Sequence, residues 1–230
     1  MGTTISFKRP DGQDVNAYLA EPAGGKSGPG VVVIQEWWGL NDQIKGVADR
    51  LAANGYRALV PDLYRGKLAL GANEAEHLMK DLNFGDAAGQ DVRGAVTYLK
   101  ASGSAKVGVT GFCMGGALTL LSAVHVPELD AGVAWYGYPP LDYIDASKIK
   151  IPLMGHWATE DAVFPIAKVA DLEQKLTAAK VRFEFHRYNA KHAFANETAD
   201  SMGMAIIKYD PVAADLAWKR TMGFFAQQLK

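Results

Sequence analysis

Short apolar segments alternate with segments of helical period along most of the chain, and this alternation limits the fold more than any other feature. The central apolar segments contain almost no polar residues, which is typical of strands buried on both faces of a parallel sheet. Two earlier segments alternate apolar and polar residues, as half-exposed antiparallel strands do. The eight predicted strands lie near residues 3–8, 14–21, 30–35, 57–60, 106–110, 131–136, 151–156 and 181–188.

Helices are predicted between these strands. They lie near residues 41–54, 73–83, 86–101, 114–125, 165–179 and 212–229. Strands that alternate with helices form right-handed βαβ units. We therefore expect an α/β fold in which a mostly parallel, eight-stranded sheet carries helices on both faces. No Gly/Ser or Pro linker and no internal repeat interrupts the pattern, which predicts a single domain over residues 1–230.

Charge and composition disfavour several functional classes. The 24 basic and 25 acidic residues give a formal net charge of -1, so nothing favours nucleic acid or an anionic membrane as a partner. No apolar run reaches the length of a transmembrane helix, and residues 1–12 lack the apolar centre of a signal peptide. A single cysteine permits no internal disulfide. We therefore expect a cytoplasmic protein in a reducing compartment.

The strongest chemical motif is the turn around that cysteine. Residues 107–116 read Val-Gly-Val-Thr-Gly-Phe-Cys-Met-Gly-Gly and join a short strand to an apolar helix. This is the G-x-S-x-G pattern of a nucleophile elbow, with Cys113 in place of serine. Gly111 and Gly115 let neighbouring backbone pass close by, and the helix N-terminus favours thiolate. Cys113 is therefore the predicted nucleophile; the alternative is a small buried hydrophobic residue.

A nucleophilic cysteine needs a histidine as its base, and in elbow-containing folds of this kind the histidine comes last in the chain. His192 lies in a loop after the last strand, at the end of the sheet where ligands gather, and is the predicted base. His125 lies at the far end of the elbow helix, and His186 lies inside a strand. His156 ends a strand and is a candidate for lining the site.

The acid that orients the histidine is expected after the preceding strand. That strand leads into Ala-Thr-Glu-Asp at residues 158–161, and Asp161 is the predicted acid. It would accept the second imidazole N–H and stabilise the imidazolium. Glu160 is its nearest rival, and Asp142 and Asp145 are weaker ones. Alternatively, Asp161 caps the helix that begins near residue 165.

Taken together, these segments resemble the dienelactone hydrolase family, the carboxymethylenebutenolidases. The resemblance covers nearly the whole chain. It rests on residues 35–39, 61–64, 111–116, 160–161 and 192–194, which read Gln-Glu-Trp-Trp-Gly, Pro-Asp-Leu-Tyr, Gly-Phe-Cys-Met-Gly-Gly, Glu-Asp and His-Ala-Phe. The cysteine in the elbow is the most specific of these features, because most relatives on this fold use serine. The resemblance implies the α/β-hydrolase fold and hydrolysis of a lactone or enol-lactone ester.

The resemblance also implies roles for residues around the cysteine. Glu36 would hold the resting thiol until substrate binds, and a carboxylate at the end of a buried strand is unfavourable without a partner. The N–H of Met114, directly after the nucleophile, is expected in an oxyanion hole, and the resemblance gives the N–H of Trp37 as its second donor. Four further residues are candidates for lining the pocket, with core or lid packing as the alternative: Trp38, Tyr64, Phe194 and Asn196.

The chain departs from the family at the substrate carboxylate. The best-known members bind that group with two arginines, one of them four residues after the histidine, where this chain has Asn196. The other belongs to the segment after strand 57–60, and residues 68–92 contain no arginine. Arg65, Lys67 and Lys191 are the candidate substitutes. Loss of both arginines argues against a dicarboxylate-type substrate.

We therefore expect a hydrolase that cleaves a small lactone or ester through an acyl-cysteine intermediate, with Cys113, His192 and Asp161 as its triad. One alternative is the same machinery acting on another neutral ester or a thioester. The other is a thiol-based redox sensor, which the absence of a second cysteine disfavours. The chemistry needs no cofactor or metal, and the expected partner is a small molecule. A monomer is the expected state.

Overall fold

The computed structural model of the protein describes residues 2–25 and 27–230. Its centre is one eight-stranded sheet in the order β1-β2-β4-β3-β5-β6-β7-β8. β2 pairs antiparallel with β1 and β4, and the remaining neighbours are parallel. The strands are β1(Thr3–Lys8), β2(Asp14–Ala20), β3(Gly30–Ile34), β4(Arg57–Pro61), β5(Val107–Phe112), β6(Ala131–Trp135), β7(Leu153–Ala158) and β8(Phe183–Tyr188).

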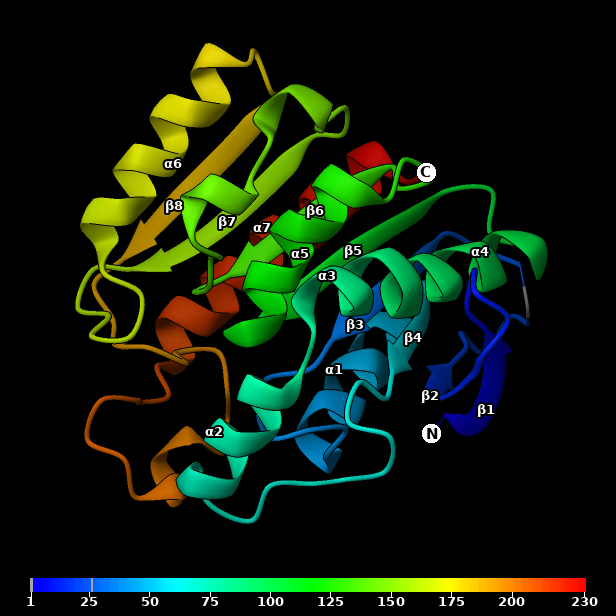
Figure 1. Ribbon diagram of the computed structural model, residues 1–230, viewed down its shortest axis with the longest axis horizontal. Coiled ribbons are helices and arrows are strands. Elements are labelled where there is room, and N and C mark those ends of the chain that lie inside the picture. The colour runs from blue at the N-terminus through cyan, green and yellow to red at the C-terminus, as the bar shows by residue number, and fades with distance from the viewer. Residues whose placement is uncertain (1, 26) are drawn as a thin grey trace.

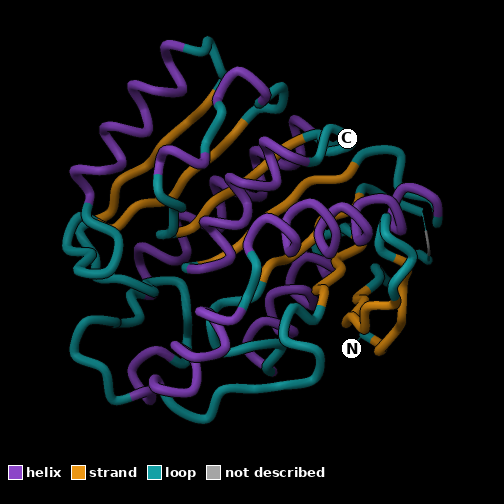
Figure 2. Tube along the Cα trace, in the orientation of Figure 1, coloured by secondary structure: helices purple, strands orange, loops and turns teal. Residues whose placement is uncertain are grey.

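Helices cover both faces of this sheet, which confirms the predicted fold class (Figure 1). One face carries α1 and α7, and the other carries α4, α5 and α6. The main helices are α1(Asp42–Ala53), α2(Ala72–Asp81), α4(Arg93–Ala101), α5(Met114–His125), α6(Ile166–Ala178) and α7(Pro211–Gln228). Figure 2 shows how the strands pass between these two layers. No helix among the described residues is long and apolar enough to cross a membrane.

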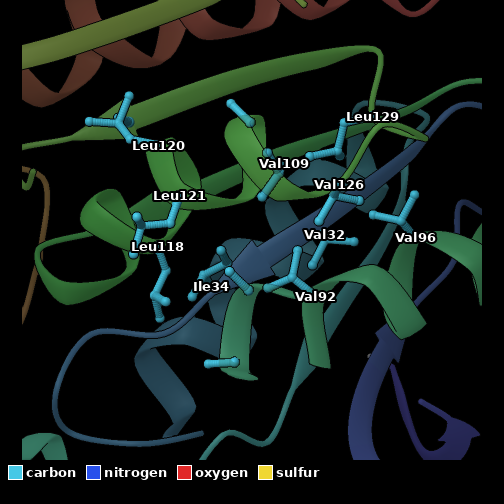
Figure 3. Close-up of a cluster of buried hydrophobic side chains, with 14 of the residues drawn as sticks. Val32, Ile34, Val92, Val96, Val109, Leu118, Leu120, Leu121, Val126 and Leu129 are labelled. Atoms are coloured by element: carbon cyan, nitrogen blue, oxygen red, sulfur yellow. The ribbon is translucent and has the colours of Figure 1, made fainter. Parts of the chain in front are cut away.

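A dense core holds α5 against the middle of the sheet. Figure 3 shows Leu118 and Leu121 of α5 among the side chains of Ile34 from β3 and Val109 from β5. Ile34, Val109 and Leu118 are fully buried. The buried side chains on all sides of α5 explain its apolar sequence, and the predicted bounds of 114–125 are those observed. The element that carries the predicted nucleophile at its start is therefore fixed by packing.

The predicted helix over residues 86–101 is corrected by the structure. It is divided into the short α3(Phe84–Asp86), the π-helical turn η1(Ala87–Val92) and α4. Nη1 of Arg9 lies 2.9 Å from a carboxylate oxygen of Asp86 and 3.2 Å from one of Asp91. A π turn bonds residues five apart, and this spacing brings both carboxylates to one guanidinium. Apolar periodicity carries no signal for this ionic cluster.

The C-terminal ends of β3, β5 and β6 lie side by side. Ile34 pairs with Gly111, and Phe112 pairs with Trp135. The loops that follow these three strands therefore meet at one edge of the sheet, where open α/β folds gather their ligand-binding residues.

Candidate active site

The turn between β5 and α5 holds Cys113 in a strained conformation. Its φ of 55° and ψ of -117° are unusual for a residue with a side chain and are expected at a nucleophile elbow. A Cβ on Gly111 would lie 2.2 Å from the Gly115 carbonyl oxygen, and one on Gly115 would lie 2.4 Å from that of Ile34. Both glycines of the motif are therefore required by close backbone approach, as predicted.

A third glycine, which the motif does not contain, also encloses the elbow. A Cβ on Gly137, just after β6, would lie 1.8 Å from the carbonyl oxygen of Cys113. The backbone N–H of Cys113 donates to the carbonyl oxygen of Trp135 at 3.0 Å. The neighbouring strand therefore buttresses the elbow. The only sequence signal for this glycine is the Trp-Tyr-Gly sequence at the end of β6, which the elbow motif does not include.

The predicted base and acid lie together. Nδ1 of His192 is 2.8 Å from Oδ2 of Asp161, and both side chains are buried. The other carboxylate oxygen, Oδ1, accepts the backbone N–H groups of Val163 and Phe164, each at 2.8 Å. Asp161 thus holds the following loop as well as the imidazole. This contact occupies Nδ1 and leaves Nε2 of His192 available to the Cys113 sulfur.

The Cys113 sulfur faces the His192 ring. Burial by itself lowers the pKa of His192, but the negative charge of the Cys113 sulfur and hydrogen bonds to Asp161 and Cys113 outweigh it and raise that pKa to about 10. The arrangement favours an imidazolium beside the sulfur, and the nucleophilic form of a cysteine is its thiolate. The geometry can therefore support proton transfer at Nε2 and attack by sulfur.

The rival acids and bases lie elsewhere. Glu160 is exposed, as are Asp142 and Asp145. His125 is exposed at the end of α5. His156 does not line the site: it is fully buried, with its ring nitrogens 2.9 Å from the Tyr188 hydroxyl and 2.8 Å from that of Thr221. Its strand runs two residues further than predicted, to Ala158, so His156 lies inside the sheet.

Glu36 is held by two other side chains. Oε2 accepts a 2.7 Å hydrogen bond from Nδ2 of Asn196, and Oε1 accepts one of 3.4 Å from the Tyr136 hydroxyl. Burial raises the pKa of Glu36, and the His192 charge and these two hydrogen bonds oppose that rise only in part. Glu36 and Cys113 line the same small cavity, and the partnership of Glu36 with the resting thiol stays a prediction.

Two backbone N–H groups are available at the elbow. Within the described residues, neither Trp37 nor Met114 donates its N–H to a protein acceptor. Trp37 is the third residue after the end of β3, and Met114 opens α5. Free N–H groups at a helix N-terminus are suited to stabilise an oxyanion. Both predicted donors thus remain free for this role.

A small apolar cavity of ≈ 170 Å³ contains the Cys113 thiol. Its walls include Glu36, Trp37, Trp38, Met79, Val163, Phe164, His192, Ala193, Met204, Ile206 and Ile207. Trp38 therefore lines it, as predicted. Tyr64, Phe194 and Asn196 do not: the Tyr64 hydroxyl donates to the Met114 sulfur at 3.3 Å, and the other two are buried behind the wall.

A strap over the cavity was missed by the sequence analysis. Residues 203–208 run back across His192, whose carbonyl oxygen accepts the N–H of Lys208 at 3.0 Å. Ile207 forms an isolated parallel bridge with His192. The orange segment after β8 extends toward α2 in Figure 1, and Met204 of the strap and Met79 of α2 both line the cavity. The run Met-Gly-Met-Ala-Ile-Ile at 202–207 was its only signal.

Two of the three candidate anion-binding cations, Arg65 and Lys191, are engaged by protein acceptors. Arg65 donates to a carboxylate oxygen of Asp91 at 2.8 Å and to the Asp62 carbonyl at 2.7 Å. Lys191 donates to the carbonyl oxygen of Ala205 at 3.1 Å. Among the described residues that line the cavity, no lysine or arginine occurs. The wall offers an anionic substrate only His192 as a cation.

This fold and this elbow define an α/β hydrolase. Solved structures of that class superpose on the whole chain: the dienelactone hydrolase-like promiscuous phosphotriesterase P91 from metagenomic libraries has a TM-score of 0.89 and 26% sequence identity, and covers 100% of this chain and 99% of its own. Thermogutta terrifontis esterase 2 has a TM-score of 0.72 at 15% identity, over 98% of this chain and 94% of its own, and shows the same fold.

The chain belongs to the dienelactone hydrolase family, whose family model matches residues 15–229. Protein usf of Aquifex pyrophilus is 38% identical over 100% of both chains. A relative from Aquifex aeolicus that bears the name carboxymethylenebutenolidase is 33% identical, again over 100% of both chains. Family, relatives and structural neighbours together support an enzyme that hydrolyses esters, as the resemblance implied.

Proposed function

We propose that the protein hydrolyses an uncharged carboxylic ester or lactone through an acyl intermediate on Cys113. The observation that carries the proposal is the alignment of three groups: the thiol at a strained elbow, the His192 ring that it faces, and Asp161 at 2.8 Å from the far side of that ring. Nucleophile, base and orienting acid are the parts that acyl transfer needs.

Acylation begins with attack of the thiolate on the carbonyl carbon, which forms a C–S bond. The carbonyl oxygen becomes an oxyanion that accepts the N–H groups of Trp37 and Met114. When the intermediate collapses, the C–O bond to the leaving group breaks and the alkoxide takes the proton from Nε2 of His192. A lactone keeps its alcohol end attached, because acid and alcohol belong to one molecule.

Deacylation uses the same groups in reverse. Neutral His192 removes a proton from water at Nε2, and the hydroxide attacks the thioester carbon. The C–S bond breaks, the thiolate returns, and the acid leaves. Asp161 keeps the ring in the tautomer and orientation that both steps need and stabilises the imidazolium. The sum is one ester and one water converted to one acid and one alcohol.

Glu36 is proposed to help stabilise the positive charge on His192. Its carboxylate is buried on the His192 side of the elbow, and the charge of His192 already lowers its pKa against the larger effect of burial. Partnering the resting thiol, as the family resemblance implies, would use Oε1, because Oε2 already accepts the 2.7 Å hydrogen bond from Asn196 and Oε1 has only the 3.4 Å hydrogen bond from Tyr136.

An uncharged substrate is favoured by the composition of the cavity wall. An anion in a partly dry site needs a fixed cationic partner, and the described wall residues include no arginine or lysine. Glu36 adds a buried acid to the same wall, which repels a substrate carboxylate. A neutral ester meets neither difficulty.

The experiment is a substrate panel combined with trapping of the acyl-enzyme. Phenyl acetate, dihydrocoumarin and S-phenyl thioacetate represent a neutral ester, a lactone and a thioester. Rapid acid quench followed by peptide mass spectrometry should find the acyl group on the peptide that contains Cys113. Cys113→Ala is the control for uncatalysed hydrolysis. Two outcomes would refute the proposal. One is hydrolysis with the acyl group trapped on another residue, and the other is no hydrolysis of any of the three substrates.

A further inference from the structure

A second, larger cavity adjoins the one that contains Cys113. Its volume is ≈ 840 Å³, against ≈ 170 Å³ for the smaller cavity. It lies along the outer side of α5, where α3 and η3(Ala146–Lys148) both contact that helix (Figure 1). Met79 and Phe164 line both cavities. We call the larger one the α5 chamber.

Two side chains join the α5 chamber to the chemistry. The Phe164 ring lies 5.5 Å from the His192 ring on one side and 5.2 Å from the Tyr138 ring, which lines the chamber, on the other. Met114, whose N–H is free for the oxyanion, contributes its side chain to the chamber wall. A group attached to the scissile carbonyl thus has a short path from one cavity to the other.

The chamber wall is suited to an uncharged apolar group. Its floor is formed by apolar side chains of α5, among them Ala117, Leu121 and Val124. Three charged side chains also line it: Lys148 and Asp145 pair with each other at 3.4 Å, and Asp142 is exposed to solvent. Pockets that bind organic ligands are mostly apolar with a few polar groups, and they have volumes of about 300–1,000 Å³.

We propose that the α5 chamber binds an extended apolar substituent of the ester substrate, while the smaller cavity holds only the reacting carbonyl and its nearest carbons. This inference rests on the proposed function. An apolar cavity of about 150 Å³ takes up a single benzene ring, so the smaller cavity has no room for a long chain. Phe164 and Met79 are the specificity-determining residues between the two spaces.

Kinetics on two ester series test the proposal. One series lengthens the acyl chain of 4-nitrophenyl esters from acetate to decanoate, and the other lengthens the alcohol of aliphatic acetates. Because each buried methylene gains about fourfold in transition-state binding, kcat/KM should rise steeply in one series until the chamber is full. The series that rises tells which part of the substrate enters it. A flat or falling dependence in both series would overturn the proposal.

Variants that fill the chamber sharpen this test. Ala117→Phe and Gly85→Trp each place a ring at a lining position, and a Cβ on Gly85 meets only the Asn83 side-chain oxygen, at 3.4 Å. Either variant should lower the ratio of long-chain to short-chain kcat/KM about tenfold or more. Val212→Trp on α7, at a residue 79% exposed, is the matched control and should keep the wild-type ratio. Wild-type ratios in both folded chamber variants would also overturn the proposal.

A binding measurement separates this inference from the proposed hydrolysis. 2-Naphthol is an uncharged apolar probe, and its binding to the Cys113→Ala protein is followed by fluorescence. Adding Gly85→Trp or Ala117→Phe to that protein should weaken binding about tenfold, whether or not the wild type hydrolyses any ester. Equal binding with and without the chamber substitution would refute the chamber. Absence of hydrolysis with chamber-dependent binding would instead refute only the enzymatic proposal.

Discussion

Nδ2 of Asn196 donates a hydrogen bond of 2.7 Å to Oε2 of Glu36, and both side chains are buried. An amide carries no charge, and this one is committed to a buried acid of the protein itself. The family resemblance implies an arginine for the substrate carboxylate at the position of Asn196. In this chain that position serves the protein's own acid, and this relationship leads to the first prediction.

Neutral esters are expected to be better substrates than their carboxylate counterparts. Each charge-assisted hydrogen bond contributes about 1.5–3 kcal/mol, so lacking two costs roughly a hundredfold or more in kcat/KM for an anion. Phenyl acetate and 4-acetoxybenzoate form a matched pair that differs in one carboxylate. Initial-rate kinetics at low ionic strength measure the ratio. A higher kcat/KM for 4-acetoxybenzoate would mean that a cationic side chain moves into the cavity and pairs with the carboxylate.

An arginine placed at the cavity mouth should reverse part of that preference. Ile206 lines the cavity and is 44% exposed, so Ile206→Arg can place its guanidinium at the opening. We expect kcat/KM for 4-acetoxybenzoate to rise about tenfold, and the gain to diminish at high salt. Val212→Arg, remote on α7, is the charge-matched control. Equal gains in the two variants would show a long-range charge effect alone.

Removal of the thiol is expected to abolish hydrolysis. Cys113→Ala leaves the elbow glycines in place, so the protein should fold, and loss of a nucleophile typically lowers kcat by several orders of magnitude. Circular dichroism and the thermal midpoint check the fold, and ester kinetics check the activity. Near wild-type turnover in the folded variant would exclude Cys113 as the nucleophile.

Asp161 and Glu160 differ sharply in expected importance, although they are neighbours in the chain. Asp161→Asn replaces the acceptor at Nδ1 of His192 with an amide that favours the wrong tautomer, so kcat should fall about a thousandfold or more. Glu160 is exposed, and Glu160→Gln should change kcat less than about twofold. Larger damage from Glu160→Gln would reverse the assignment of the acid.

The charged state of His192 sets the expected alkaline limit of activity. The imidazolium can protonate a leaving group below its pKa of about 10, and kcat/KM should therefore fall as the pH rises through about 10. Asp161 is one of the groups that raise this pKa, so the alkaline limb should move to lower pH in Asp161→Asn. Rates between about pH 6 and 11, corrected with Cys113→Ala blanks, measure the alkaline limb of the wild type and of Asp161→Asn. An unmoved limb would argue that another group titrates.

Acid sensitivity of the fold is expected from His156. Burial lowers the pKa of His156 well below 6.5, and the unfolded residue regains that usual value. Below pH 6.5 the unfolded chain therefore binds a proton that the folded protein does not. As the pH is lowered, the free energy of unfolding falls by up to about 1.4 kcal/mol per pH unit. Urea denaturation at several pH values measures this slope. His156→Gln should reduce it, and an unchanged slope would assign it to other groups.

Most of the fold could be predicted because its signals are local. The central strands are buried on both faces and read as apolar runs, and α5 has the predicted bounds. The placement of Cys113 and His192 beside one another could be predicted because chain order and position after a strand are fixed by the topology. The contact of Asp161 with His192 was predictable too, since Asp161 follows the strand next to β8.

The surroundings of the thiol could not be predicted in the same way. Glu36 and Asn196 are 160 positions apart, and an amide in place of an arginine gives no indication of which carboxylate it will contact. Met79 and Ile206 come from an amphipathic helix and a loop, and their sequences alone suggest ordinary surface packing. Cavity walls assembled from distant loops depend on the folded backbone rather than on any periodic pattern.

The chain has a single cysteine, and that residue lies in the strap-covered cavity beside His192. A thiol reagent therefore labels this one site, with no background from other cysteines. The molar amount of reagent consumed counts competent sites in a preparation. Because the wall is narrow and apolar, a small uncharged reagent such as iodoacetamide should react faster than a bulky or anionic one of equal intrinsic reactivity. The ratio of the two labelling rates measures how readily the strap admits a bulky or anionic reagent to Cys113 in solution.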